Sequence, residues 1–240
     1  MNNKVTNTRK GRRFIMEEAD LKKKLAGEKA VEYIKDGMTL GLGSGSTVYW
    51  TLKKLGELVK KGLDIKGVPS SLRTEGWAQS FGVPLTDFQK VRQLDLAIDG
   101  ADEVDPHFNL IKGGGGSLVR EKIVNAASNK VIIVVDESKI VTRLGKFALP
   151  IEVVPFGWEV TASYISELGC KPILRKRENQ VFVSNNGNYI LDCLFDKIEI
   201  ASELHLRIKE VVGVVETGLF IGMTDMVIVG MSSGVQTINK

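Results

Sequence analysis

"MTLGLGSGSTVYWTLKKLGELV", residues 38–59, contains a short apolar run, a turn rich in glycine and serine, and an amphipathic segment. The run at 38–42 predicts a short buried strand. The apolar positions after the turn recur at helical spacing: Val48, Leu52, Leu55 and Val59. They indicate the buried face of a helix, so the stretch predicts a strand, a glycine-rich turn and a helix in that order.

The same alternation of strands and helices is expected on both sides of this stretch. Apolar positions from Ala19 onward fit one helical face, and Asp36 and Gly37 are expected to end that helix. The further elements expected before Pro150 are strands at 65–68, 94–98 and 131–135 and helices at 72–81 and 118–129. Because the strands are uninterrupted apolar runs, they predict a parallel sheet covered by helices on both faces.

The pattern changes after Pro150. The elements expected there are a strand at 151–154, a helix at 160–168, a strand at 173–177, a hairpin around NNGN at 185–188, a helix at 204–212 and a strand at 214–220. Apart from one short strand, this order is βαββαβ, the ferredoxin-like arrangement. The last apolar run, MVIVG at 226–230, has no partner left in that unit, so we expect it to return to the large sheet.

The predicted fold class is therefore α/β, a Rossmann-like parallel sheet domain with a smaller ferredoxin-like α+β domain near the C-terminus. We expect a large catalytic domain at 17–146 plus 226–240 and a small domain at 147–225. Residues 1–16 carry five basic and no acidic side chains and are interpreted as a disordered basic tail. A start-site artefact, a nucleic-acid arm and an organellar presequence are the alternatives for this segment.

The composition is that of an ordinary globular protein, with 43% hydrophobic residues, 26% charged residues and a formal net charge of +4. No apolar run approaches the roughly 20 residues that span a bilayer. No signal-peptide core follows the charged start. We therefore expect a soluble, cytoplasmic protein with no membrane partner. Basic residues are not interleaved with aromatic ones, so no nucleic acid partner is expected either.

Few side chains are suited to metal binding. Cys170 and Cys193 lie in no CxxC or Cys/His cluster, and we interpret them as reduced thiols. His107 and His205 have no HxH or HExxH spacing and are interpreted as ordinary surface or hydrogen-bonded residues. No metal is predicted, because a zinc site made of carboxylates alone is atypical.

The turn after the first strand is suited to binding a phosphate. It brings backbone N–H groups and the hydroxyls of Ser44, Ser46 and Thr47 to a helix N-terminus, where aligned peptide dipoles favour an anion. The alternative is that Ser46 or Thr47 only caps the helix. A dinucleotide site is not expected, because the GxGxxG pattern needs glycine where this chain has Ser46.

A second chemical stretch, IDGADEVDPHFNLIKGGGGSLVREKI, occupies residues 98–123. Asp99 and Asp102 directly follow a predicted strand, which places them at the carboxyl edge of the sheet, where ligands of open α/β folds bind. Lys112 precedes four glycines at 113–116, and such a run lets backbone amides converge on an oxyanion. A plain flexible loop is the alternative.

Glu121 is the candidate base. Ser117 can cap the helix that follows the glycines, and Glu121 then lies in its first turns, where the helix dipole helps to keep a carboxylate ionised. The alternative is a surface glutamate that complements the dipole. Lys139 follows another predicted strand and reaches the same sheet edge, whereas Arg120 and Lys122 are interpreted as solvated.

Several motifs together resemble one known family. They are GLGSGSTV, VPSS, DGADEVD, KGGGGSLVREKI, VDESK, LGKFALPIEVVPFG and GVQTI, in this order, over about residues 21–240. Their combination is similar to type A ribose-5-phosphate isomerase. The chain departs from the family pattern at Ser44, Gly116 and Val119, where threonine, alanine and threonine are frequent, and the basic residues before Met16 lie outside the resemblance.

The resemblance implies interconversion of ribose 5-phosphate and ribulose 5-phosphate through an enediolate, without cofactor or metal. It implies a catalytic role for Glu121 as base and for Asp99, Asp102 and Lys112. The implied substrate-binding residues are Ser44, Gly45, Ser46, Thr47, Asp99, Gly100, Ala101, Asp102, Lys112, Gly113, Gly114, Gly115 and Lys139. Asp99 is expected to act on the ring oxygen during ring opening and Asp102 to orient hydroxyls. A homodimer or homotetramer is implied as well.

Two other functions compete with isomerisation. A phosphosugar deaminase would use the same phosphate turn and a carboxylate base, and would release ammonia. A non-catalytic sugar-phosphate sensor is the alternative from a different class, because a fold does not determine a function. A sensor has no need of Glu121 together with Lys112, so the isomerase is favoured.

Overall fold

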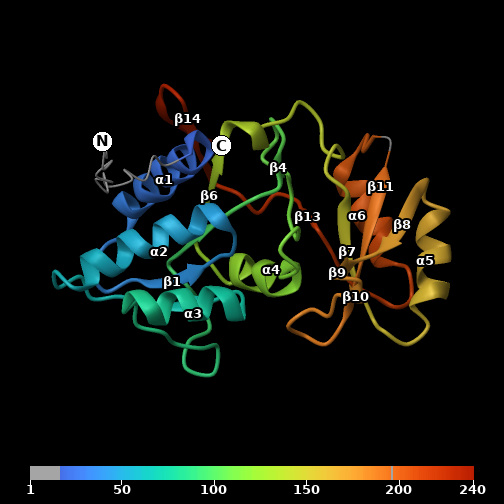
Figure 1. The fold of residues 1–240 in the computed structure, drawn as a ribbon, viewed down its shortest axis with the longest axis horizontal. Helices are drawn as coiled ribbons and strands as arrows, with labels where there is room; N and C mark the ends of the chain where they lie inside the picture. The colour runs from blue at the N-terminus through green and yellow to red at the C-terminus, as the bar shows by residue number, and fades with distance from the viewer. Residues whose placement is uncertain (1–16, 196) are drawn as a thin grey trace, which may run out of the picture.

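Two sheets with their helices lie side by side along the long axis of the molecule (Figure 1). The structure is a computed structural model that describes residues 17–195 and 197–240. The predicted disordered tail at 1–16 lies outside the described residues. The first part of the chain, up to residue 136, forms most of the large sheet and its helices. Residues 149–217 supply the small sheet, and residues 226–239 return to the large one.

The large sheet has six strands. Their order is β15 (Gly234–Asn239), β14 (Met226–Met231), β6 (Val131–Asp136), β3 (Leu96–Asp99), β1 (Thr39–Leu42) and β2 (Lys66–Pro69). All neighbours pair in parallel except β14 with β15. The parallel sheet and the return of the chain through β14 confirm the prediction, whereas β15 was not predicted.

Helices cover both faces of this sheet, as the uninterrupted apolar strands predicted. The helices are α1 (Glu18–Ala30), α2 (Ser46–Val59), α3 (Leu72–Phe81) and α4 (Leu118–Ala126). In β6, Ile132 and Val134 belong to the core formed with α1, α2 and α3. Val131, Ile133 and Val135 belong to the opposite core, which includes α4.

The small sheet is antiparallel and has the strand order of a ferredoxin-like unit. The order is β12 (Val214–Thr217), β7 (Leu149–Val153), β11 (Tyr189–Phe195) and β8 (Cys170–Leu174). Apolar residues of α5 (Trp158–Ser166) and α6 (Ala201–Lys209) share one core with this sheet. A short hairpin of β9 (Lys176–Arg177) and β10 (Gln180–Val181) extends from it.

The predicted strand at 214–220 is divided in the structure. Its first part is β12 in the small sheet, and its second part, β13 (Leu219–Phe220), joins β5 (Leu110–Ile111) and β4 (Glu103–Val104) in a three-stranded sheet. Gly218 lies at the division. Its carbonyl oxygen accepts from Lys112 N–H at 2.9 Å, and its N–H donates to Pro150 O at 2.7 Å. A Cβ at Gly218 would lie 2.4 Å from Lys112 O, so only glycine fits this crossing.

Candidate active site

The strand order reverses between β1 and β3. From β1 the chain first adds β2 on one side of it and then crosses to add β3 on its other side. In open α/β sheets, ligands bind outside the carboxyl ends of the strands at such a point. The turn at 43–45 follows β1, residues 100–102 follow β3, and η2 (Glu137–Lys139) follows β6. The structure thus brings the three predicted strand ends to one edge.

A cavity of about 530 Å³ opens at this edge. The predicted residues that line it are Ser44, Gly45, Ser46, Thr47, Gly100, Ala101, Asp102, Lys112, Gly113, Gly115, Glu121 and Lys139. Asp99 and Gly114 are absent from the lining. Residues that the sequence did not single out also line it, among them Lys23, Arg73, Arg177, Phe182 and Asn185.

The turn after β1 leaves the start of α2 without a side-chain cap. The N-cap residue is Gly45, with φ of 112°, and no side chain accepts a hydrogen bond from the first turn. The Ser44 hydroxyl instead lies 2.9 to 3.2 Å from the hydroxyls of Ser70, Ser71 and Thr74. The amides of the first turn thus face the cavity uncapped, which favours anion binding over the capping alternative.

Lys23 and Lys139 add positive charge to the same cavity. Lys139 lies in η2, whereas Lys23 comes from α1, which packs against β6 and β14. The sequence did not indicate Lys23, because helical periodicity identifies the buried face of α1 but not the sheet edge beside which its polar face lies. Two lysines that line the same cavity as the uncapped amides make it suited to a phosphate.

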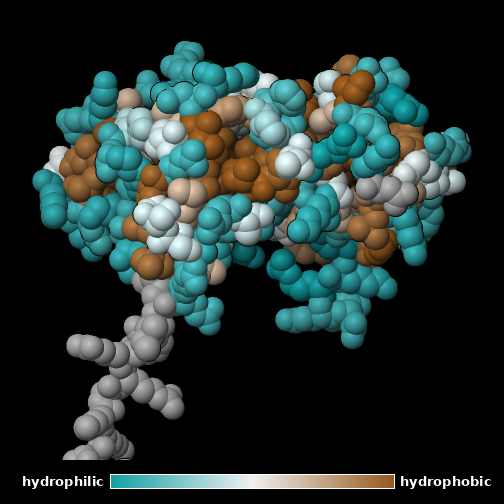
Figure 2. Space-filling view, turned by 90° about the horizontal axis from the view of Figure 1, so that it is seen from above, coloured by the Kyte–Doolittle hydropathy of each residue, from teal (hydrophilic) through white to brown (hydrophobic). Residues whose placement is uncertain are grey.

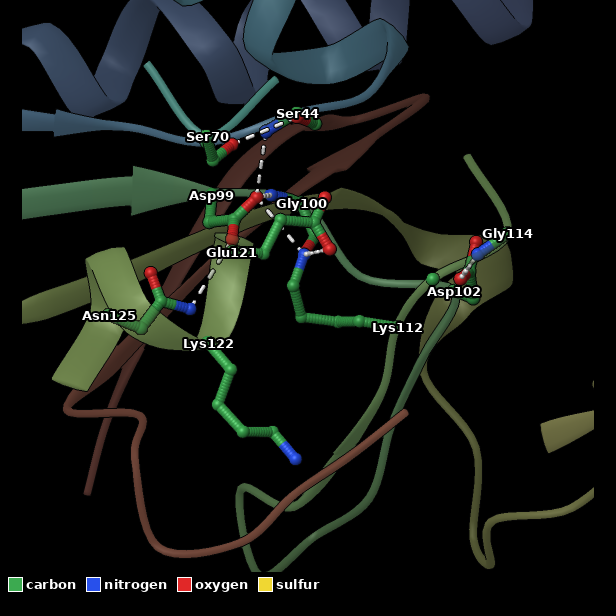
Figure 3. A network of polar contacts seen from close by, with 12 residues as sticks. Ser44, Ser70, Asp99, Gly100, Asp102, Lys112, Gly114, Glu121, Lys122 and Asn125 are labelled. Atoms are coloured by element: carbon green, nitrogen blue, oxygen red, sulfur yellow. Dashed lines mark hydrogen bonds and ion pairs between the residues drawn. The ribbon is translucent and has the colours of Figure 1, made fainter. Parts of the chain in front are cut away.

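At the inner end of the cavity, Lys112 lies between two carboxylates (Figure 3). Its Nζ is 3.0 Å from Asp99 Oδ1 and 3.3 Å from Glu121 Oε2, and it donates to Gly100 O at 2.6 Å. The relative exposures are 2% for Lys112, 0% for Asp99 and 4% for Glu121. The cluster is therefore screened little by solvent, and its charges interact strongly.

Burial raises the pKa of Glu121 to about 7, against the opposing effect of the Lys112 ammonium. The charges of Asp99 and Asp102 raise this pKa further. The pKa of Lys112 is raised as well, because the neighbouring Asp99 and Glu121 carboxylates outweigh burial, which by itself would lower it. Lys112 therefore stays charged, and Glu121 is the group that exchanges a proton near neutral pH.

Asp102 and the glycine loop (residues 113–116) form another wall of the cavity. Gly114 N–H donates to Asp102 Oδ2 at 2.8 Å (Figure 3). A Cβ at Gly114 would lie 2.8 Å from Asp102 Oδ1, so glycine is required where the loop crosses this carboxylate. The loop is held against Asp102, which argues against a plain flexible linker.

Lys122 is largely buried and hydrogen-bonded, so its interpretation as a solvated side chain was wrong. Lys122 Nζ donates to Glu216 Oε1 at 3.0 Å and to the carbonyls of Thr217 and Leu219 at 2.8 Å each. Its side chain points away from the Lys112 cluster (Figure 3), and burial lowers its pKa to about 8. The polar face of α4 meets the strand that crosses between the two sheets, a contact that helical periodicity does not reveal.

Arg120 also has partners from the second half of the chain. It donates to Asn186 Oδ1 at 2.8 Å and to Asn185 O at 2.7 Å.

Within residues 17–195 and 197–240, no group of three or more His, Cys, Asp or Glu side chains is placed to hold a metal ion. None of the helices in the described part of the chain is both long and apolar enough to cross a membrane.

Comparisons with known proteins agree with this geometry. Residues 66–234 match the family model of ribose 5-phosphate isomerase A (phosphoriboisomerase A). The chain is 55% identical over 216 residues to ribose-5-phosphate isomerase A 1 of Oceanobacillus iheyensis, covering 90% of this chain and 96% of the relative. It is 54% identical over 217 residues to ribose-5-phosphate isomerase A of Bacillus anthracis, covering 90% and 99%.

Solved structures show the same similarity. Ribose 5-phosphate isomerase from Plasmodium falciparum superposes with a TM-score of 0.89 at 42% identity, covering 92% of this chain and 99% of that one. A D-ribose-5-phosphate isomerase in complex with phospho-erythronic acid gives a TM-score of 0.88 at 38% identity, covering 91% and 98%. The chain belongs to the ribose 5-phosphate isomerase A family.

Proposed function

We propose that the protein interconverts D-ribose 5-phosphate and D-ribulose 5-phosphate. The observation that carries the proposal is the pairing of Glu121, with a pKa raised to about 7, and the charged Lys112 at the inner end of the cavity. A base is most effective when its pKa lies near the working pH. Family membership supports the same reaction.

The substrate phosphate is assigned to the outer end of the cavity. The uncapped amides at Ser46 and Thr47 and the ammonium groups of Lys23 and Lys139 supply donors and positive charge there. A related isomerase has been solved with a phosphorylated sugar acid, phospho-erythronic acid. With the phosphate at this end, the aldehyde end of an open-chain pentose extends toward Lys112 and Glu121.

The isomerisation itself requires one proton to move between two carbons. In the aldose-to-ketose direction, Glu121 takes the proton from C2 and returns it to C1, while the hydroxyl proton on O2 moves to O1. The intermediate is an enediolate, whose negative oxygen needs donors in a site with little water. Lys112 and the amides of the glycine loop supply them, and the reaction needs no redox cofactor.

Asp102 and Asp99 have different surroundings, and we propose different roles for them. Asp102 lines the cavity, so it is placed to orient substrate hydroxyls. Asp99 is fully buried and accepts from Ser44 N–H at 3.0 Å and Gly100 N–H at 2.8 Å, besides pairing with Lys112. Positioning Lys112 is the role that this geometry supports. A direct part for Asp99 in ring opening stays a prediction.

The test is formation of ketose from ribose 5-phosphate by the purified protein in the presence of a chelator. We expect full activity with chelator. A metal requirement would contradict the proposed electrophile, because a divalent ion would then replace Lys112 and the amides. Ammonia release from an amino sugar phosphate would identify a deaminase, and binding without turnover would identify a sensor.

We also propose that the protein is a homodimer or homotetramer and is cytoplasmic. Large apolar side chains are exposed on the described residues, among them Phe156 and Val212, and apolar surface gathers near the middle of the face seen in Figure 2. Apolar patches bordered by polar residues are typical of protein interfaces. Light scattering of the purified protein tests the oligomer, and cell fractionation tests the location.

A further inference from the structure

The glycine loop has no side chains of its own to hold its shape. Glycine populates many backbone conformations, and one hydrogen bond within the loop, from Gly116 N–H to Gly113 O at 2.9 Å, closes a turn but leaves the peptides on either side of Gly114 to be oriented by other residues. Asp102 does so on one side by accepting from Gly114 N–H. On the other side, Arg175 Nη1 donates to Gly113 O at 2.7 Å and to Gly114 O at 3.3 Å.

Arg175 comes from the small sheet, between β8 and β9. Its guanidinium pairs with the Asp192 carboxylate in β11, with Nε 2.9 Å from Oδ2 and Nη2 bonded to Oδ1. A two-point pair of this kind fixes the plane of the guanidinium. The remaining nitrogen, Nη1, is thereby directed at the loop carbonyls. The Arg175 side chain is largely buried, which limits its freedom further.

The direction of the loop amides follows from the planarity of the peptide group. In a trans peptide, the C=O of one residue and the N–H of the next point in opposite directions. Gly113 O faces Arg175 and Gly114 N–H faces Asp102, as this rule requires. Gly114 O also faces Arg175, so the N–H of Gly115 points the opposite way, and Gly115 lines the cavity.

We propose that Arg175 is a positioning residue for the isomerisation, holding the glycine loop so that Gly115 N–H faces the enediolate oxygen. The proposal rests on the proposed function and extends it to a residue outside the large sheet. Phe182 supports the same arrangement from the small unit. Its ring lies against Gly116, where a Cβ would come within 2.3 Å of Phe182 Cζ, and the Arg175 guanidinium lies 5.8 Å from the ring centre.

The test compares Arg175→Ala and Arg175→Lys with the wild type and with Arg207→Ala. Arg207 is an exposed arginine on α6 of the same unit and serves as the matched control. For Arg175→Ala we expect kcat to fall roughly 10- to 100-fold, up to the loss seen when one oxyanion donor is removed, with KM changed only a few-fold. Lysine supplies one donor without the planar fork, so Arg175→Lys is expected to recover part of the loss.

Binding measurements separate positioning from a merely structural role. Affinity for phospho-erythronic acid, a sugar acid whose carboxylate stands in for the enediolate oxygens, should fall in parallel with kcat. Affinity for inorganic phosphate should not change, because the hydrogen bonds of Arg175 go to Asp192, Gly113 and Gly114 and to none of the residues assigned to the phosphate. Asp192→Asn should produce a smaller loss of kcat and of phospho-erythronic acid affinity, because the Arg175 guanidinium then loses its charged partner.

Two results would overturn the inference. One is an Arg175→Ala protein with unchanged kcat and unchanged affinity for phospho-erythronic acid. The other is an equal loss of affinity for phosphate and phospho-erythronic acid with a lowered melting temperature, which would make Arg175 structural. Failure of the proposed function is a different outcome, an inactive wild type and an inactive Arg207→Ala, and the two binding measurements still test Arg175 in that case.

Discussion

Replacing Glu121 with glutamine tests the proposed base directly. The substitution keeps the size of the side chain and removes its ability to take a proton. A positioned base contributes roughly 10²- to 10⁴-fold to a rate, so turnover should fall by that factor, which raises the barrier by about 3 to 5.5 kcal/mol. Substrate binding should persist, because the phosphate end of the cavity is untouched.

The same substitution should stabilise the protein above neutral pH. Burial raises the pKa of Glu121 from 4.5 to about 7. Between these values the unfolded chain releases the proton and the folded protein keeps it, so stability falls as pH rises through this window. Glutamine has no such titration. The variant should therefore match the wild type below pH 4.5 and exceed it above pH 7, by an amount on the order of 3 kcal/mol.

The assay combines ketose formation under saturating substrate with denaturant unfolding at pH 4.5 and pH 8. Glu203→Gln is the matched control, because Glu203 also lies in the first turn of a helix, α6, but is exposed. It should change neither rate nor stability by more than about 0.5 kcal/mol. Near-normal turnover of Glu121→Gln would refute the argument, and the proton transfer would then be reassigned to Asp102. A variant less stable than the wild type at pH 8 would refute the raised pKa.

The remaining predictions concern other parts of the chain. Lys139→Ala should weaken binding of ribose 5-phosphate and make the residual affinity less dependent on salt, since a lysine acts on phosphate as a point charge; titrations at low and high salt measure this. Lys122→Met should lower the free energy of unfolding by roughly 1 to 3 kcal/mol, because Glu216 and two carbonyls lose a buried donor. Deleting residues 1–15 should leave kcat and KM within a few-fold of the full chain.

The fold was predictable because it depends on local patterns. Uninterrupted apolar strands separated by helical periodicity specify a parallel sheet with two covered faces. β15 escaped prediction because its residues, Gly234–Asn239, have no comparable apolar run and pair only at the sheet edge. The strand at 214–220 was wrongly read as continuous, since the close approach of Lys112 O that divides it at Gly218 comes from a distant segment.

The same distinction separates what was and was not predictable in the site. Residues at strand ends, such as Asp102 and Lys139, could be placed because parallel strands end at one sheet edge. Lys23 and Arg175 could not, because each reaches the site from a helix or sheet whose orientation depends on packing. Both residues can be recognised only in the folded structure. Lys23 lines the cavity, and Arg175 donates to the carbonyls of Gly113 and Gly114.

The buried cluster also explains why Glu121 is suited to exchange a proton. Asp99 receives hydrogen bonds from Ser44 N–H, Gly100 N–H and Asn125 Nδ2 in addition to its pairing with Lys112. Glu121 Oε2 lies 3.3 Å from the same ammonium but accepts no hydrogen bond from the described residues. One lysine cannot fully compensate two buried carboxylates. Burial therefore raises the pKa of Glu121, the carboxylate with fewer hydrogen-bond donors. That carboxylate faces the cavity, where a substrate carbon can supply or receive the proton.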